Sequence, residues 1–208
     1  MFKLRDTLTY KLVRLLAKPI IKVLYRYEIH NKNNLPKEGR FIVCPNHLSL
    51  VDCAFIVISQ KRPIHFMAKE ELFENKFLAF LLKALGVFPV SRGRGDMKAM
   101  NTANDILENG GVLGIFIEGT RSKDGNLLQP KAGVALIAHK TQTPVLPICI
   151  TPKNGGKIKI FKKVIITCGE PISVDELGIV DGKGSEMRNA ARLIMNRISE
   201  MREQDLCR

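Results

Sequence analysis

Apolar and polar positions alternate in two different patterns along this chain. Short apolar runs of strand length alternate with longer stretches in which apolar residues recur every three or four positions. The runs predict strands over 40–44, 64–68, 87–91, 111–117, 145–151, 157–160 and 164–168. The recurrences predict helices over 50–60, 69–85, 96–109, 132–140 and 185–202, with a loop at 178–184. This alternation predicts an α/β fold with a mostly parallel central sheet flanked by helices.

The first 27 residues have a pattern of their own, typical of an amphipathic helix. One face carries Leu12, Val13, Leu16, Ile20, Val23, Leu24 and Tyr27, and the other Lys3, Lys11, Arg14, Lys18, Lys22 and Arg26. Pro19 predicts a kink or the start of a second helix. Such a segment could pack on the domain, bind a calmodulin-like partner, or lie in a membrane interface with its basic face on anionic headgroups. We favour the membrane anchor, which divides the chain into an anchor (1–27) and a domain (28–208).

Composition narrows the function classes. The 208 residues suffice for one domain with an appendage, and the net charge of +13 predicts anionic partners. With no Trp and 3 Tyr, few rings could stack on bases, so we expect no nucleic-acid partner. The 5 cysteines form no C-x-x-C pair, which disfavours disulfides and zinc. We also expect neither a signal peptide nor a membrane span, because charges interrupt every long apolar stretch.

Three polar motifs directly follow predicted strands. They are PNHLSLVD (45–52), RGRGD (92–96) and EGTRSKDG (118–125). Ligands of open α/β sheets bind beyond the carboxyl ends of the strands, so these motifs should converge there.

His47 and Asp52 are the candidate acid–base pair. In one straight helix they would lie about 140° apart, so they meet only if His47 lies in the turn before the helix. Ser49 as the N-cap would place Asp52 at the third helical position, which also allows a purely structural interpretation as a helix cap. An aspartate bonded to one imidazole nitrogen leaves the other nitrogen as a general base. Without a G-x-S-x-G motif, we do not expect Ser49 to be a nucleophile.

The other two motifs suit a phosphate. Glycine-rich turns expose main-chain N–H groups, and arginines add paired donors, here Arg92, Arg94 and Arg121. Lys131 could add a further positive charge. The alternative for 118–122 is a surface turn with a solvated Glu118–Arg121 pair. The apolar segment 72–85 could line an acyl groove, touch a bilayer or form core.

These residues resemble a known family. Residues 46–52 are similar to the N-H-x-S-x-x-D (HX4D) signature of glycerolipid acyltransferases, and GVFPVSR, FIEGTRS and VLPI resemble the family's later blocks. Val90-Ser91 stands where an Ile-Asp pair is common. The blocks span about residues 40–150, and the single short domain most resembles bacterial 1-acyl-sn-glycerol-3-phosphate acyltransferases.

The resemblance implies an activity and roles. It implies transfer of an acyl group from acyl-CoA or acyl carrier protein to the sn-2 hydroxyl of lysophosphatidic acid, giving phosphatidic acid, with no cofactor, metal or acyl-enzyme. It makes His47 the base and Asp52 its orienter, supported by Asn46 and Ser49. The glycerol-phosphate acceptor would be held by Arg92, Glu118, Gly119 and Arg121, with the arginines on its phosphate and Lys131 as a further positive charge. The enzyme would be a monotopic or peripheral protein on the cytoplasmic face of the membrane.

Several alternatives stay open. Main-chain N–H groups of 46–49 are candidate donors to the oxyanion of the thioester. A related acyltransferase could use glycerol 3-phosphate or another lysolipid. A basic protein that binds membranes or nucleic acid without catalysis would leave the motifs at 46–52 and 116–122 without a role. The sequence leaves open the acyl chain length, the donor carrier, the oligomeric state and the source organism.

Overall fold

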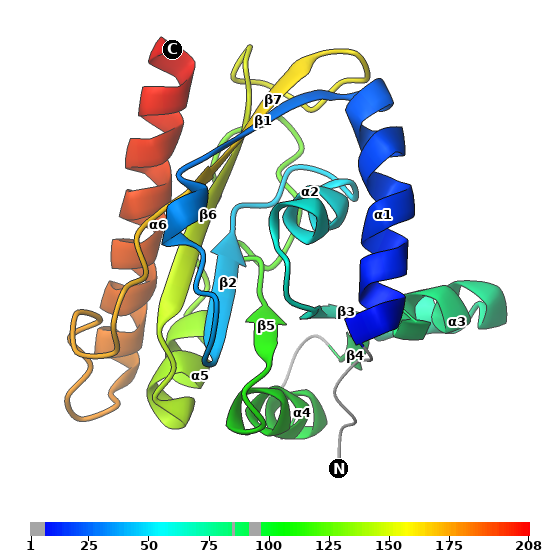
Figure 1. Ribbon diagram of the computed structural model, residues 1–208. Coiled ribbons are helices and arrows are strands. Elements are labelled where there is room, and N and C mark those ends of the chain that lie inside the picture. Colours follow the sequence, from blue (N-terminus) through cyan, green and yellow to red (C-terminus); the bar gives the residue numbers. More distant parts are fainter. Residues whose placement is uncertain (1–6, 85, 92–96) are drawn as a thin grey trace.

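A sheet with helices on both faces forms the body of the protein, in a computed structural model that describes residues 7–84, 86–91 and 97–208 (Figure 1). The helices are α1 (Thr7–Leu24), α2 (Asp52–Ser59), α3 (Lys76–Ala84), α4 (Met97–Glu108), α5 (Gly133–Thr141) and α6 (Gly184–Cys207). The strands are β1 (Arg26–His30), β2 (Phe41–Pro45), β3 (Ile64–Lys69), β4 (Phe88–Val90), β5 (Val112–Gly114), β6 (Val145–Pro152) and β7 (Lys163–Cys168). Two 3-10 turns, η1 (Lys32–Asn34) and η2 (Glu70–Phe73), complete the described elements.

The strands form one seven-stranded sheet in the order β1-β7-β6-β2-β5-β3-β4. β6 and β7 are antiparallel, and the other neighbouring pairs among the described residues are parallel. The predicted α/β fold with a mostly parallel sheet is therefore confirmed. The central strand β2 is buried along its whole length, as expected for a strand covered on both faces.

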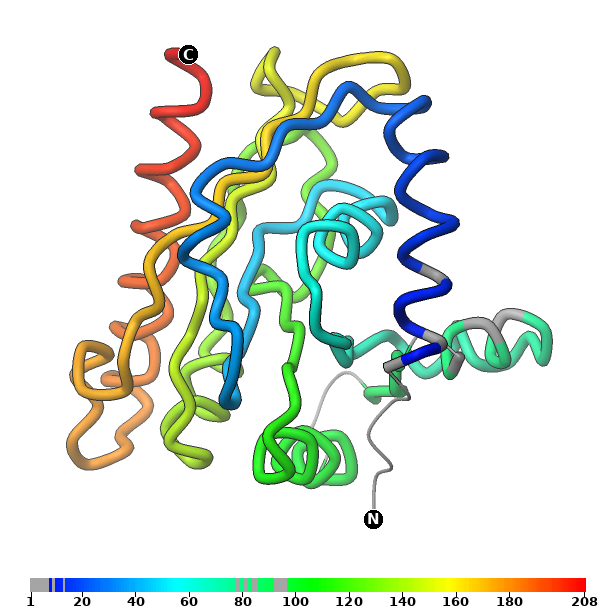
Figure 2. The backbone as a smooth tube through the Cα atoms, in the orientation of Figure 1, coloured from blue at the N-terminus to red at the C-terminus, as the bar shows by residue number. Residues whose placement is uncertain are grey.

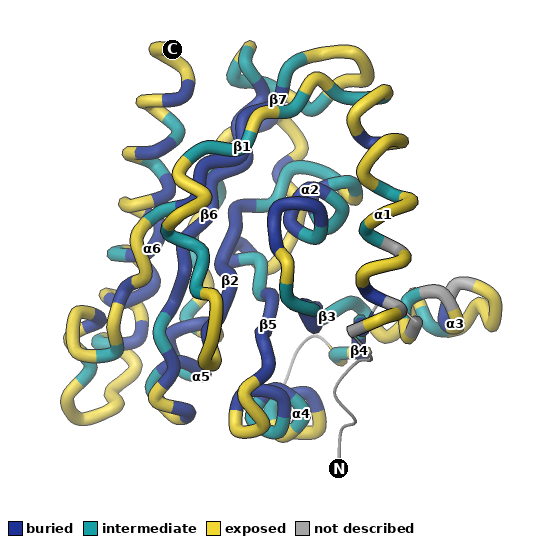
Figure 3. Tube along the Cα trace, in the orientation of Figure 1, coloured by how far each residue is buried: buried dark blue, intermediate teal, exposed yellow. Residues whose placement is uncertain are grey.

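The core lies in two layers, one on each face of the sheet, because successive strand residues point to opposite sides. Ile42 of β2 packs in the layer under α4, α5 and α6, whereas its neighbours Phe41 and Val43 pack in the layer that α1 and α2 cover. The backbone trace shows these helices on either side of the sheet (Figure 2), and the strands between them are mostly buried (Figure 3).

Two predictions about the elements need correction, and one strand was not predicted. Residues 157–160 do not form a strand: they belong to the loop between β6 and β7. Residues 69–85 do not form one helix, because η2 and a turn precede α3. The edge strand β1 was missed, since its alternating polar side chains lie next to the α1 pattern. It pairs with β7, so the sheet begins inside the predicted anchor segment.

The helix α1 runs through Pro19 as one helix and packs on α2. Tyr10 is buried and donates its hydroxyl proton to the carbonyl oxygen of Val57 at 3.1 Å. Arg14, predicted on the solvent face, is instead half-buried and donates to the carbonyl oxygen of Ile58 at 3.3 Å. The opposite face is apolar and exposed, through Leu8, Leu12, Leu15, Leu16, Ile20 and Val23. Among the described residues, no helix is both long enough and apolar enough to cross a membrane.

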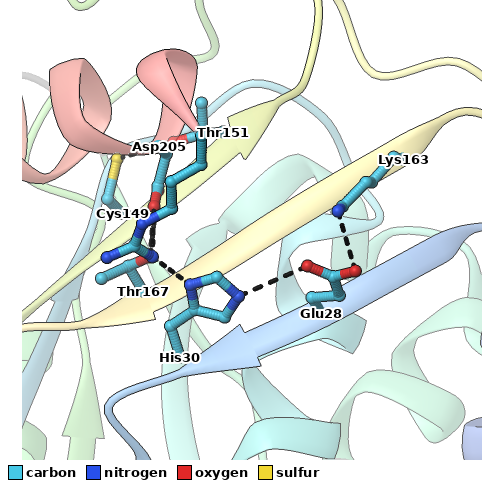
Figure 4. Close-up of polar contacts among 8 residues, drawn as sticks. Glu28, His30, Cys149, Thr151, Lys163, Thr167 and Asp205 are labelled. Carbon is cyan, nitrogen blue, oxygen red and sulfur yellow. Dashed lines mark hydrogen bonds and ion pairs between the residues drawn. The ribbon is translucent and has the colours of Figure 1, made fainter.

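The last turn of α6 is attached to the sheet by a buried carboxylate (Figure 4). Asp205 is fully buried, and its oxygens accept hydrogen bonds from the hydroxyl groups of Thr151 on β6 (3.0 Å) and Thr167 on β7 (2.8 and 3.0 Å). Nearby on the surface, Glu28 of β1 pairs with Lys163 of β7 at 2.8 Å. The bonds to Asp205 hold the C-terminal helix against the carboxyl end of β6, the end where the candidate site lies.

Candidate active site

The loop after β2 brings His47 and Asp52 together. The Nδ1 atom of His47 lies 2.8 Å from Oδ2 of Asp52. The Asp52 carboxylate is fully buried, whereas the imidazole is 14% exposed. An ionised carboxylate only accepts, so Nδ1 carries the proton and Nε2 is left as the basic nitrogen. The structure therefore provides the geometry that a general base requires.

Asp52 also organises the turn that contains His47. Its Oδ2 atom accepts the main-chain N–H groups of Leu48 at 2.6 Å and Ser49 at 2.8 Å. The predicted cap is only half right, because α2 begins at Asp52 itself and Val51 is its N-cap. Asp52 bonds back to the Ser49 N–H as a capping-box acid does, but the Ser49 hydroxyl makes no cap bond to the helix.

The same contacts correct the expectation for the oxyanion donors. The N–H groups of Leu48 and Ser49 donate to Asp52, and that of His47 donates to Glu118. These three groups are occupied by carboxylates, so they do not form a free cradle for a developing negative charge.

The segment after β5 fixes the backbone of His47 on both sides. The His47 N–H donates to Oε1 of Glu118 at 3.1 Å, and the His47 carbonyl oxygen accepts the N–H of Ser122 at 2.8 Å. The N–H groups of Ile115 and Ile117 donate to the carbonyl oxygens of Val43 and Pro45. These bonds continue the β2–β5 pairing as far as the start of the His47 loop. The predicted convergence of the first and third motifs is confirmed.

Phe116 forms one wall of the site. Its ring stacks on the His47 imidazole, with centroids 3.8 Å apart and planes inclined by 17°. Phe66 of β3 lies behind it, with a centroid distance of 5.8 Å. The sequence motifs gave Phe116 no role, although they hold one indication. In an extended segment the side chains of Phe116 and Glu118 lie on the same side of the backbone, so both would face the same site. The ring covers one face of the imidazole and keeps water from it.

Glu118 is buried beneath the histidine rather than displayed at the surface. Its side chain belongs to a residue only 1% exposed, and Oε2 has no hydrogen-bond partner among the described residues. Burial raises the pKa of Glu118 to about 7, although hydrogen bonds from the main-chain N–H groups of His47 and Leu128 oppose the rise. The burial of this carboxyl group argues against the alternative of a surface turn with a solvated Glu118–Arg121 pair.

Asn46 attaches the start of the loop to β6. Its side chain is fully buried, with Nδ2 donating to the carbonyl oxygen of Ile150 at 3.1 Å and Oδ1 accepting the Ile150 N–H at 2.8 Å. The amide thus extends the β2–β6 pairing beyond Pro45, where β2 ends. Asn46 thus holds the start of the loop that carries His47.

The structure describes some, but not all, of the residues predicted to hold the acceptor. Gly119, Arg121 and Lys131 are exposed on the segment after β5. Gly119 has a φ of 67°, and a Cβ added there would lie 3.3 Å from Cγ of Lys131, so the two residues are adjacent. Arg92, with the rest of the loop 92–96, lies outside the described residues. Within the described part of the chain, no group of three or more His, Cys, Asp or Glu residues could hold a metal ion.

Fold and site together define an α/β protein with a histidine–aspartate pair at the carboxyl ends of adjacent parallel strands. Comparison with known proteins agrees. The family model described as "Acyltransferase" matches residues 26–151. A Bacillus subtilis protein named 1-acyl-sn-glycerol-3-phosphate acyltransferase is 32% identical over 166 residues, covering 78% of this chain and 82% of the relative. A Borreliella burgdorferi protein of the same name is 28% identical, covering 74% and 61%.

Among solved structures, the 1-acyl-sn-glycerophosphate (LPA) acyltransferase PlsC from Thermotoga maritima matches with a TM-score of 0.74 and 26% identity, over 94% of this chain and 79% of that one. The chain belongs to the acyltransferase family, and the resemblance seen in its motifs is confirmed.

Proposed function

We propose that this protein transfers an acyl group from an acyl thioester to the sn-2 hydroxyl of lysophosphatidic acid, giving phosphatidic acid. The observation that carries the proposal is the 2.8 Å contact between His47 Nδ1 and Asp52 Oδ2, at the position where the chain matches the acyltransferase family. The names of its bacterial relatives support the choice of acceptor.

The proposed reaction needs one base and no covalent enzyme intermediate. Nε2 of His47 takes the proton from the acceptor hydroxyl as its oxygen attacks the thioester carbonyl carbon. The resulting tetrahedral intermediate breaks its carbon–sulfur bond, and the departing thiolate receives the proton from His47. The products are an ester and a free thiol, carried by coenzyme A or by acyl carrier protein. No cofactor or metal takes part in this scheme.

Asp52 stabilises the histidine during this cycle. Its carboxylate holds the Nδ1 proton and balances the positive charge that appears when Nε2 is protonated. Because Oδ2 also binds the N–H groups of Leu48 and Ser49, the carboxylate cannot turn away from the imidazole without losing those bonds. Asp52 is thus held in the orientation that the base needs.

We assign the acceptor phosphate to the exposed basic residues near the pair. The Arg121 guanidinium offers paired donors that match phosphate oxygens, and Lys131 adds a point charge beside Gly119. Arg92 belongs to this set by resemblance. The burial of Glu118 favours a different role for this residue: it positions His47 through the main-chain bond instead of contacting the acceptor.

The acceptor is a lipid, and α1 offers a way to reach it. Its exposed apolar face would lie at the acyl boundary of a membrane, while Lys11, Lys18 and Lys22 reach anionic headgroups. We propose that α1 binds the membrane peripherally, on the cytoplasmic face. Replacing Leu12, Leu16 and Ile20 with serine and measuring vesicle binding tests this proposal. Deletion of residues 1–27 is a poorer test, because it would also remove the buried Tyr10 and Ile21.

Product analysis by mass spectrometry tests the reaction. Wild-type protein and His47→Ala would be incubated with lysophosphatidic acid and mixed acyl thioesters of coenzyme A and acyl carrier protein. We expect phosphatidic acid from wild type and from the control His30→Ala, whose histidine lies on the edge strand β1, but none from His47→Ala. Glycerol 3-phosphate and other lysolipids in parallel would identify another acceptor. Turnover by His47→Ala near the wild-type rate would refute the mechanism.

A further inference from the structure

The loop between β6 and β7 exposes two large apolar side chains at its end. Ile160 is 53% exposed and Phe161 is 64% exposed. Phe161 also has a φ of 62°, a left-handed backbone conformation that is rare for a bulky residue.

Lysines surround these two residues. Lys157, Lys159 and Lys162 are exposed, and no acidic residue occurs anywhere between residues 153 and 169. Lys163, at the start of β7, pairs with Glu28 of β1, so that carboxylate already has a lysine partner. The loop end, which we call the basic tip (157–162), therefore combines two apolar side chains with uncompensated positive charge.

The basic tip continues the exposed face of α1. The N–H of Phe161 donates to the carbonyl oxygen of Leu24, the last residue of α1, at 2.7 Å. The final turns of the helix expose Ile20 and Val23 and carry Lys22. In Figure 1 the loop lies beside this end of α1. The two segments thus form one surface although Leu24 and Ile160 are 136 positions apart in the sequence.

This surface lies at the edge of the sheet where the site opens. β2 and β6 are parallel, so the loops that follow them emerge at the same edge. His47 follows β2, and the basic tip follows β6. A lipid held at the basic tip would therefore face the edge that carries the candidate base.

We propose that the basic tip is a second membrane contact, with Ile160 and Phe161 in the interface of an anionic bilayer and the lysines on its headgroups. The inference rests on the membrane association proposed above for α1 and adds a contact that orients the site toward the lipid surface. Apolar side chains ringed by lysines suit anionic lipid because burial and charge attraction then act together. Two contacts also fix the tilt of the domain, which one helix cannot do.

The chain contains no Trp, so Phe161→Trp creates a single fluorescent probe at the basic tip. Vesicles of phosphatidylcholine with phosphatidylglycerol should shift its emission to the blue, and brominated lipids should quench it. Vesicles of pure phosphatidylcholine should shift the emission only weakly. Val180→Trp is the control, since Val180 is 82% exposed and precedes α6, whose last turn bonds the carboxyl end of β6. The control residue thus lies at the opposite edge, and its emission should not change.

A second variant removes the apolar contact without straining the loop. Phe161→Asn keeps the main-chain bond to Leu24, and Asn adopts the left-handed conformation more readily than Phe. We expect vesicle affinity to fall about tenfold. Glutamine at Lys157, Lys159 and Lys162 should lower it by about fivefold for each lysine, and only at low salt. Lys140→Gln on α5, which precedes the amino end of β6, should change nothing.

Transfer to a water-soluble, short-chain lysophosphatidic acid separates this proposal from the proposed reaction. Phe161→Asn should keep that activity while losing turnover on vesicles. If the wild-type protein showed no transfer to this soluble acceptor, the proposed reaction would be refuted, whereas the membrane contact would not. The contact is refuted if Phe161→Trp emission stays unchanged on vesicles that sediment with the protein, or if the protein sediments with none. The contact would also be refuted if the same blue shift of Phe161→Trp emission appeared without vesicles, either when the protein concentration is raised or when acyl carrier protein is added.

Discussion

The main-chain N–H of His47 donates a hydrogen bond to the buried carboxyl group of Glu118 at 3.1 Å, across 71 positions of the sequence. This bond joins the loop after β2 to the segment after β5. Together with the bond from Ser122 to the His47 carbonyl oxygen, it leaves the histidine backbone little freedom. The imidazole is then held between Phe116 and Asp52, so its second nitrogen points in a defined direction.

Glu118→Gln should change how stability depends on pH. Burial raises the pKa of Glu118 to about 7, so the folded protein binds this proton more tightly than the unfolded chain. The unfolding free energy should therefore fall as pH rises from about 4.5 to about 7, by on the order of 3 kcal/mol. Glutamine keeps an acceptor for the His47 N–H but cannot ionise, so this part of the slope should disappear. Denaturant unfolding across this pH range measures it.

Glu203→Gln is the matched control, because Glu203 is exposed on α6. It should leave the pH profile as in wild type. Equal slopes for wild type and Glu118→Gln would show that the buried carboxyl group does not retain its proton. In activity assays, Glu118→Ala should lower kcat more than it raises the acceptor KM if the residue only positions His47.

Asp52→Asn tests the charge of the pair apart from its geometry. The substituted NH2 group can take the place of Oδ1, which has no hydrogen-bond partner among the described residues, while the oxygen keeps its three donors. The fold should persist, and kcat should fall by about 10²–10⁴. Steady-state kinetics beside an Asp175→Asn control, at an exposed position, would measure the loss. A kcat within about threefold of wild type would contradict the proposed role of the carboxylate.

Arg121→Ala should weaken binding of the phosphorylated acceptor. Losing charge-assisted bonds to phosphate should raise the acceptor KM about tenfold to a hundredfold and leave the thioester KM nearly unchanged. Arg188→Ala, at an exposed position on α6, should alter neither constant. If the donor KM rose instead, Arg121 would belong to the thioester site.

Asp205→Ala should loosen the C-terminal helix without touching the chemistry. The change leaves the hydroxyl groups of Thr151 and Thr167 without their acceptor in the core. We expect the unfolding free energy to fall by about 2–4 kcal/mol. Amide exchange in the last turns of α6 should become faster, and kcat on soluble substrate should hold. Glu203→Ala, exposed on the same helix, should do neither; unchanged exchange in Asp205→Ala would mean that packing alone holds the helix.

The sequence by itself determined the fold class and the candidate acid–base pair. Apolar runs that repeat in two periods follow from which side chains must leave water, so most strands and helices were predictable within a few residues. The spacing of His47 and Asp52 is also local: one turn joins them, and five positions of chain allow the 2.8 Å contact. The family motifs rest on the same short stretches, so the residues alone are enough to carry the resemblance.

Only the tertiary structure decided what surrounds that pair. Whether Glu118 faces solvent or lies under His47 depends on β2 and β5 being neighbours in the sheet. The misassigned segment 157–160 has a strand-like alternation, yet it passes beyond the end of α1 and finds no partner strand. Burial, pKa and exposure of these residues are set by contacts with distant parts of the chain, because each depends on how much water the folded neighbours exclude. Local sequence carries no measure of that.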